Sequence, residues 1–125
     1  MKKNILYILI TVIYSQTVFH DITEQTGTEY SYPHFHNHLG AGVTIVDINN
    51  DGFDDIISPT YTGDNIKVFM NSGNLEFLES ASNLGISSTD ESKQVLVADY
   101  NNDGYNDLYI INYNNSSILY KNINN

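Results

Sequence analysis

The feature that most constrains this chain is an internal repeat. The segment VTIVDINNDGFDDIISPTY, which starts at Val43, returns 52 residues later as VLVADYNNDGYNDLYIINY, which starts at Val95. Self-similarity at such a period is typical of proteins built from small units, each of which needs a neighbour to bury its apolar residues. The repeat therefore predicts a modular architecture in which equivalent sites recur from unit to unit.

Each unit consists of short apolar, β-branched and aromatic runs separated by turn residues, a pattern that predicts β-strands. In the first unit we expect strands over residues 42–48, 56–61, 65–70 and 75–80, and a long connection over 81–91. In the second unit we expect strands over residues 94–100, 108–113 and 117–122. The strand over 42–48 is apolar at nearly every position, which predicts burial on both of its faces.

Four antiparallel strands in about 40–50 residues is the size of one β-propeller blade. We therefore predict an all-β fold, an incomplete β-propeller of about two four-stranded blades, with blade 1 over residues 42–91 and a truncated blade 2 over 92–125. A propeller closes with roughly four to eight blades, so we expect the remaining blades in sequence that follows this chain. The alternative is a small standalone sandwich, which would leave its last strand as a bare edge.

Residues 1–17 have the layout of a bacterial-type secretory signal peptide. Lys2 and Lys3 precede an apolar run over residues 5–14, and a more polar segment follows. This run is shorter than the roughly 20 residues of a membrane-spanning helix. We expect removal near Gln16 or Thr17, a mature chain without a membrane span, and a location outside the cell or at its surface. The alternatives are an uncleaved anchor and an N-terminal core strand.

Residues 18–41 are predicted to form a fourth-strand-like segment and a linker. FHDITEQTG from Phe19 matches FLESASNLG from Phe77 in the placement of its Phe, acid and Gly. In the linker, His34, His36 and His38 alternate. On a strand they would share one face and could bind a transition metal. Because no acid lies at ligand spacing beside them, we favour an exposed connecting segment.

Composition excludes several classes of partner. The chain has fifteen acidic and five basic residues and a formal net charge of −10, and both lysines of the leader count toward it. So acidic a chain has no basic patch with which to bind nucleic acid or an anionic membrane. It also has no cysteine, which excludes disulfides and thiolate metal sites.

Each repeat contains an acidic loop of the pattern D-x-N-x-D-G-x-x-D, over residues 47–55 and 99–107. Oxygen ligands at alternate positions and a backbone carbonyl at the seventh are what Ca²⁺ requires, and glycine at the sixth permits the positive φ of a sharp turn. The pattern predicts about two Ca²⁺ sites. Their predicted ligands are Asp47, Asn49, Asp51, Phe53 and Asp55 in the first loop, and Asp99, Asn101, Asp103, Tyr105 and Asp107 in the second.

Two other interpretations of the loops are less well supported. A solvated Asn-Asp-Gly turn needs no metal, but two copies with identical spacing favour metal binding. An EF-hand needs a bidentate acid at position twelve, where this chain has Ser58 and Ile110, and its flanks are helical instead of β-rich. Asp54 and Asn106, which precede the last ligand of each loop, are expected to face solvent or to cap the following strand.

The segment LGAGVTIVDINNDGFDDIISPTY resembles an FG-GAP or VCBS-type repeat, the blade unit of integrin-α-like β-propellers. FHDITEQTG, LEFLESASNLGI and SILYKN resemble more narrowly the cartilage-acidic-protein-like, ASPIC/UnbV-associated branch. The resemblance implies an extracellular propeller with calcium in its blade hairpins, used for adhesion or ligand binding. The chain departs from the family at Leu39-Gly40, where a Gly-Phe pair is usual, and keeps only Ser58-Pro59 of the Gly-Ala-Pro element.

We therefore expect a secreted, non-catalytic, calcium-binding module whose partner is an extracellular protein or glycan. The chain lacks the G-x-S-x-G elbow of a serine hydrolase. Residue type alone leaves a paired-carboxylate glycosidase open, although metal ligation explains the acids better. The alternative function is a scaffold or carbohydrate-binding accessory of an extracellular enzyme whose catalytic region lies outside this chain, since propellers serve both roles.

Overall fold

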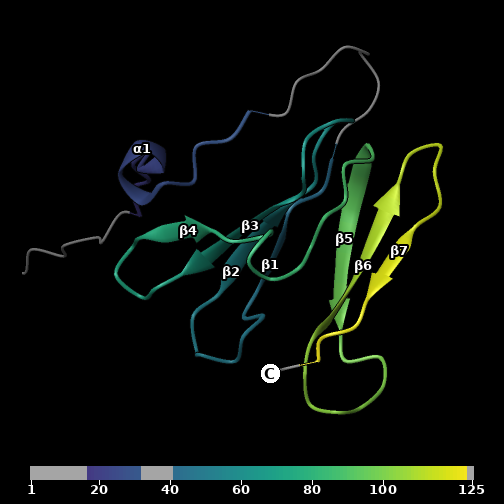
Figure 1. Ribbon diagram of the computed structural model, residues 1–125. Coiled ribbons are helices and arrows are strands. Elements are labelled where there is room, and N and C mark those ends of the chain that lie inside the picture. The colour runs from purple at the N-terminus through teal and green to yellow at the C-terminus, as the bar shows by residue number, and fades with distance from the viewer. Residues whose placement is uncertain (1–16, 32–40, 124–125) are drawn as a thin grey trace, which may run out of the picture.

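The computed structural model describes residues 17–31 and 41–123. These residues form two antiparallel β-sheets side by side, with one short helix next to the first sheet (Figure 1). Residues 1–16 of the predicted signal peptide, the three alternating histidines and Leu39-Gly40 lie outside the described residues. Within the described residues, no helix has the length and apolar character that crossing a membrane requires.

Each sheet is a meander in which consecutive strands are neighbours. The first sheet contains β1 (Thr44–Val46), β2 (Asp55–Ser58), β3 (Lys67–Asn71) and β4 (Phe77–Glu79). The second contains β5 (Ser92–Ala98), β6 (Asp107–Asn112) and β7 (Ile118–Tyr120). All seven predicted strands are present with shifted ends, which confirms the all-β, blade-like prediction.

The strand registers show that the two sheets are structurally equivalent. Ile57 pairs with Val68 in the first sheet, and Tyr109 pairs with Leu119 in the second. Counted between paired residues, the connection from β6 to β7 is one residue shorter than the connection from β2 to β3. Equivalent residues are therefore 52 positions apart in β2 and β6, and 51 positions apart in β3 and β7. As a consequence Lys121 occupies, after β7, the position that Met70 occupies in β3.

The main core lies between the two sheets. It is formed by apolar side chains from both sheets and from the connection between them: Ile48, Ile57, Ile66, Val68, Ala81, Ile86, Val95, Leu108 and Ile110. Fully burying an isoleucine such as Ile57 contributes about 1.5–3 kcal/mol. Hydrogen bonds also join the sheets, because the Ser92 N–H donates to the Thr60 carbonyl at 2.9 Å and the Thr60 N–H to the Ser92 hydroxyl at 2.8 Å.

The prediction that residues 42–48 are buried on both faces is wrong. β1 is an edge strand, and only one of its faces is turned toward the second sheet, where the Thr44 hydroxyl donates to the Val95 carbonyl. Ile45, on the opposite face, is 66% exposed. The apolar pattern of this strand was therefore not sufficient to establish that a neighbour covers both of its faces.

Residues 17–22 do not form a strand, and α1 (Thr23–Thr26) follows them. The resemblance between FHDITEQTG and FLESASNLG lies instead in a helical turn that ends at a glycine with positive φ, Gly27 at 74° and Gly85 at 73°. The acid begins each turn, since Asp21 accepts the Thr23 N–H and Glu79 accepts the Ala81 N–H, both at 3.0 Å. A strand needs a hydrogen-bonded partner, which β3 provides for β4. The described part of the chain places no strand beside residues 17–22.

Candidate metal centre

The two acidic loops lie at the same end of the molecule, where β1 turns into β2 and β5 turns into β6 (Figure 1). The side-by-side arrangement of equivalent sheets therefore brings two sequence-equivalent loops close together in space.

In the first loop, side chains fold back onto the loop's own backbone. Asp47 accepts the Gly52 N–H at 2.8 Å and the Asp51 N–H at 3.1 Å. The Asp51 carboxylate accepts the Phe53 N–H at 2.9 Å and the Asn49 side-chain amide at 2.8 Å. These bonds link Asp47, Asn49 and Asp51, three of the predicted ligands, within one turn.

The second loop repeats this arrangement. Asp99 accepts the Gly104 N–H at 2.8 Å and the Asp103 N–H at 3.1 Å, and Asp103 accepts the Asn101 side-chain amide at 2.8 Å. Backbone angles agree as well. The φ angles of Asn50 and Gly52 are 59° and 92°, and those of Asn102 and Gly104 are 60° and 92°. Asparagine and glycine tolerate this left-handed region better than other residues, so the loop's own sequence determines its conformation.

The last acid of each loop is buried and holds backbone amides. Asp55 accepts the Ile48 N–H at 3.0 Å with one oxygen and the Asn71 N–H at 2.8 Å with the other. Asp107 accepts the Tyr100 N–H at 3.2 Å and the Asn122 N–H at 2.8 Å in the same way. Burial raises the pKa of Asp55, the two amide bonds oppose the rise, and the negative charges of Asp51 and Asp47 add to it.

The predicted side-chain ligands of each loop therefore fall into two groups, one within the turn and one buried at the end of the loop. The side chains of the first, third and fifth loop positions are gathered by hydrogen bonds, whereas the buried ninth-position carboxylates tie each loop to the end of a third strand or its equivalent. Phe53 and Tyr105, whose carbonyls are the predicted seventh-position ligands, are exposed. Among residues 17–31 and 41–123, no group of three or more His, Cys, Asp or Glu side chains forms a metal-binding cluster.

The donor set fits Ca²⁺ by its chemistry. Each loop presents carboxylate, amide and carbonyl oxygens without nitrogen or sulfur ligands, which is the set that hard cations accept. A carboxylate oxygen has two lone pairs, and each Asp55 oxygen accepts one N–H, so Asp55 retains capacity for a cation. Asp47, Asn49, Asp51 and Asp55 would hold the ion in the first loop, and their equivalents would hold it in the second.

A hydrogen bond that the sequence did not indicate joins the two loops. The Asn106 side-chain amide donates to the Asp47 carbonyl at 3.0 Å, and the Asn106 carbonyl accepts the Asn122 side-chain amide at 3.2 Å. The expectation that Asn106 faces solvent or caps its strand is therefore wrong. The available signal was that this loop position changes between repeats, from Asp54 to Asn106, because only the amide is a donor at neutral pH.

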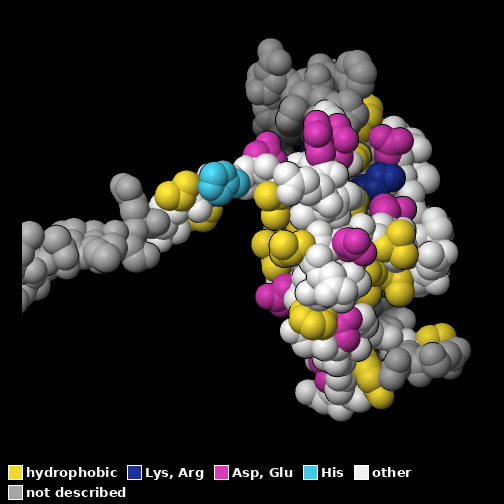
Figure 2. All heavy atoms as spheres, turned by 90° about the vertical axis from the view of Figure 1, so that its left-hand side faces the viewer, with side chains coloured by type: hydrophobic (Ala, Val, Ile, Leu, Met, Phe, Trp, Pro, Cys, Tyr) yellow, Lys and Arg dark blue, Asp and Glu magenta, His cyan; other side chains and the backbone are white. Residues whose placement is uncertain are grey.

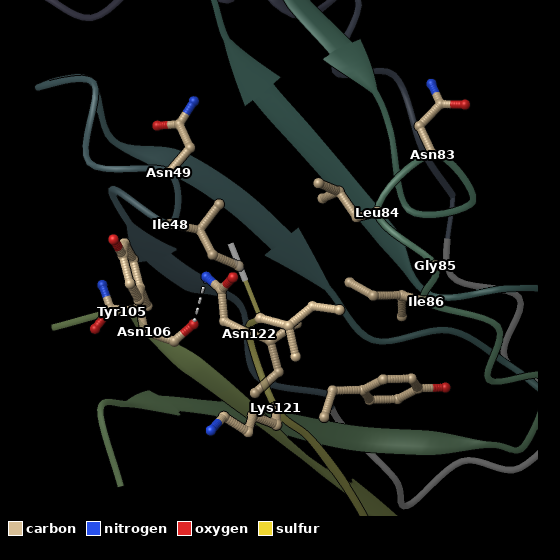
Figure 3. Close-up of a pocket in the computed structure, with 13 residues that line it drawn as sticks. Ile48, Asn49, Asn83, Leu84, Gly85, Ile86, Tyr105, Asn106, Lys121 and Asn122 are labelled. Atoms are coloured by element: carbon tan, nitrogen blue, oxygen red, sulfur yellow. Dashed lines mark hydrogen bonds between the residues drawn. The ribbon is translucent and has the colours of Figure 1, made fainter. Parts of the chain in front are cut away.

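Beside this bond, a cleft of about 520 Å³ opens between the two sheets (Figure 3). It is lined by both loops, by the connection after β4 and by the residues that follow β7: Ile48, Asn49, Asn83, Leu84, Gly85, Ile86, Tyr105, Asn106, Leu108, Tyr120, Lys121, Asn122 and Ile123. The cleft therefore combines an apolar floor with amide and tyrosine side chains.

The charged residues within the two loops, over residues 47–55 and 99–107, are all aspartates. Figure 2 shows more acidic than basic side chains on the face that carries α1 and β4. In the second loop, however, the Lys121 ammonium lies 3.4 Å from Asp103 Oδ2. Desolvation is the largest single influence on the pKa of Asp103 and raises it. Hydrogen bonds from the Asn101 amide, the Tyr105 N–H and Lys121, together with the lysine charge, outweigh it and lower this pKa.

The equivalent antiparallel sheets and the doubled loop define a β-propeller-like repeat module. The family model described as FG-GAP-like repeat matches residues 47–110, from the first residue of the first loop to beyond the second loop. The chain belongs to this FG-GAP-like repeat family. A comparison with curated proteins returned no match. The narrower cartilage-acidic-protein-like branch stays a prediction from the sequence.

Proposed function

We propose that this protein is a secreted, calcium-binding β-propeller module that binds an extracellular protein or glycan without catalysing a reaction. The observation that carries the proposal is the doubled loop, in which two segments 52 residues apart adopt the same hydrogen-bonded conformation and contain the same carboxylate and amide side chains. Turn propensity alone would account for the bends at Asn50 and Asn102. It would not account for a buried carboxylate at the ninth position of both loops.

Electrostatics supports a divalent cation as the loop's ligand. Two unit charges about 4 Å apart repel by about 4 kcal/mol at an effective dielectric of 20. Burial is the main cause that raises the pKa of Asp55, and the charges of Asp51 and Asp47, which lie on the same turn, add to the rise. A bound cation replaces this repulsion by attraction, so that calcium binding and loop stability are thermodynamically linked.

The open face of the second sheet supports the presence of further blades. Ile57 and Val68 are fully buried between the sheets, whereas their register equivalents Tyr109 and Leu119 are 41% and 51% exposed. Leu96, on β5, is also exposed. A third sheet of the same kind would cover this face as the second sheet covers the first.

The cleft supports the ligand-binding part of the proposal, since concave sites with an apolar floor and a few polar groups are typical of binding pockets. The predicted leader supports secretion. Mass spectrometry of the exported product tests this part, and we expect a chain that starts near residue 17 or 18. An intact Met1 on a cytoplasmic product would contradict secretion.

Calorimetry on the full chain tests calcium binding. We expect about two Ca²⁺ ions per chain and much weaker binding of Mg²⁺, which demands small octahedral sites. Zn²⁺ serves as the control for the alternating histidines. The proposal fails if Ca²⁺ produces no heat, or if Zn²⁺ binds more tightly and that binding is lost when the histidines are replaced.

A further inference from the structure

The two predicted calcium loops differ in one charged neighbour. Lys121 follows β7 and its ammonium lies 3.4 Å from Asp103 Oδ2, and the two side chains are 50% and 32% exposed. In the first sheet, the register places Met70 at the equivalent position. Met70 has no charge and packs against the hydrophobic core. The two repeats therefore share a loop conformation, but this position holds the positively charged Lys121 in the second repeat and the uncharged Met70 in the first.

We infer that Lys121 makes the two sites unequal, so that the loop over residues 99–107 binds Ca²⁺ more weakly than the loop over residues 47–55. This inference rests on the proposed calcium function and assigns Lys121 a role that tunes affinity. The physical reason is competition. A calcium ion in the second loop must attract Asp103 away from Lys121, and the positive charge that remains nearby repels the incoming cation.

The geometry also limits the size of the effect. Asp103 Oδ2 accepts the Asn101 amide at 2.8 Å in addition to the contact with Lys121, as Asp51 Oδ2 accepts the Asn49 amide. The contact with Lys121 is thus the main difference between the surroundings of the Asp51 and Asp103 carboxylates. Because exposed ion pairs are weak and screened by salt, we expect the two affinities to differ by about threefold to tenfold.

The chain contains an internal probe that distinguishes the two sites. The second loop carries Tyr100 and Tyr105, whereas the first carries Ile48 and Phe53 at the same positions. Terbium is a hard trivalent cation that accepts the same oxygen ligands, and it luminesces strongly when a nearby tyrosine absorbs the exciting light. Tyr105 also lines the cleft beside Asn49 of the first loop. Terbium emission is therefore assigned to the second loop by its loss in Asp103→Asn and its retention in Asp51→Asn. Calorimetry with Ca²⁺ reports both loops.

The test compares the full-length wild type with Lys121→Met, which reproduces the first repeat, and with Lys121→Arg, which keeps the charge. In wild type we expect two calcium affinities about threefold to tenfold apart, with calcium displacing terbium emission at the weaker one. Lys121→Met should bring the weaker affinity up to the stronger, and Lys121→Arg should leave it low. The reciprocal Met70→Lys should weaken the first site alone, and circular dichroism checks its fold.

The possible failures are distinguishable. Two equal affinities in wild type, or a weak site that does not respond to Lys121→Met and to a second neutral variant, Lys121→Gln, would overturn the inference and leave the calcium function intact. Absence of calcium binding in every variant would overturn the proposed function, and this inference with it. Lys121 is half exposed, so the neutral variants should keep the wild-type circular dichroism spectrum.

Discussion

The two acidic loops have the same backbone conformation but different neighbours. In the first, the Asp47 carbonyl accepts a hydrogen bond from Asn106 of the following unit, and the adjacent strand contributes the uncharged Met70. In the second, Asp103 lies beside Lys121. The repeated sequence thus specifies the backbone conformation of each loop. The charges and hydrogen bonds around the loop depend instead on the residues that lie next to it.

The largest expected effect in this comparison comes from removing one loop carboxylate. Asp51→Asn keeps a turn-forming residue of similar size but removes one charge from the proposed calcium cage. In calcium at about 100 times Kd, the loss of one site should cost up to about 2.7 kcal/mol of stability. In chelator, we expect unchanged or slightly higher stability because repulsion from Asp47 is removed. Thermal melts in both buffers measure the reversal.

Asp103→Asn is the matched control for this prediction. It should behave similarly in calcium but lose a little stability in chelator, because it also removes the ion pair with Lys121. If the Asp51→Asn melts shift together in both buffers, the metal interpretation of the first loop is wrong.

A second effect, of similar size, concerns the buried carboxylate. Asp55→Asn should cost about 1–3 kcal/mol even in chelator, because an amide can accept only one of the two N–H bonds and opposes a donor to the other. Asp107→Asn should cost a similar amount, since its bonds are equivalent. Urea unfolding in chelator measures both. If Asp55→Asn is as stable as Asp51→Asn in chelator, the buried carboxylate does not stabilise the fold.

The contact between the loops predicts a smaller effect. Asn106→Ala removes the hydrogen bond to the Asp47 carbonyl and should cost about 1 kcal/mol. It should also weaken calcium binding at the first loop. The matched control is Asp54→Ala, at the same repeat position, whose exposed side chain should contribute within about 0.5 kcal/mol. Equal effects of the two variants in denaturant unfolding would argue against this contact as a link between the units.

The smallest expected effect is the dependence of the Lys121 contribution on salt. The electrostatic screening length falls from about 30 Å at 0.01 M to about 3 Å at 1 M ionic strength. The difference in calcium affinity between wild type and Lys121→Met should therefore decrease as salt is added. Calcium titrations of both proteins at low and high potassium chloride measure this change. A difference that does not depend on salt would assign the effect to packing instead of charge.

Much of the fold could be predicted from the sequence because its signals are local. The doubled D-x-N-x-D-G-x-x-D pattern located both loops, and alternation with turn residues located all seven strands. The match between FHDITEQTG and FLESASNLG predicted a shared strand, whereas the structure shows that the two segments share a turn that ends at Gly27 and Gly85. Three expectations that depended on a neighbour were wrong. The strand over 42–48 has an exposed face, residues 17–22 form no strand, and Asn106 contacts the preceding unit.

The sequence by itself determined the loop conformation, because Asn50, Gly52 and their equivalents adopt positive φ whatever surrounds them. It also determined the set of oxygen donors. Only the tertiary structure decided which faces are buried, since Ile57 and Tyr109 hold equivalent register positions but a second sheet packs only on Ile57. It likewise decided that Lys121 lies beside Asp103. Burial and ion pairing depend on distances between segments far apart in the chain, and local sequence does not encode those distances.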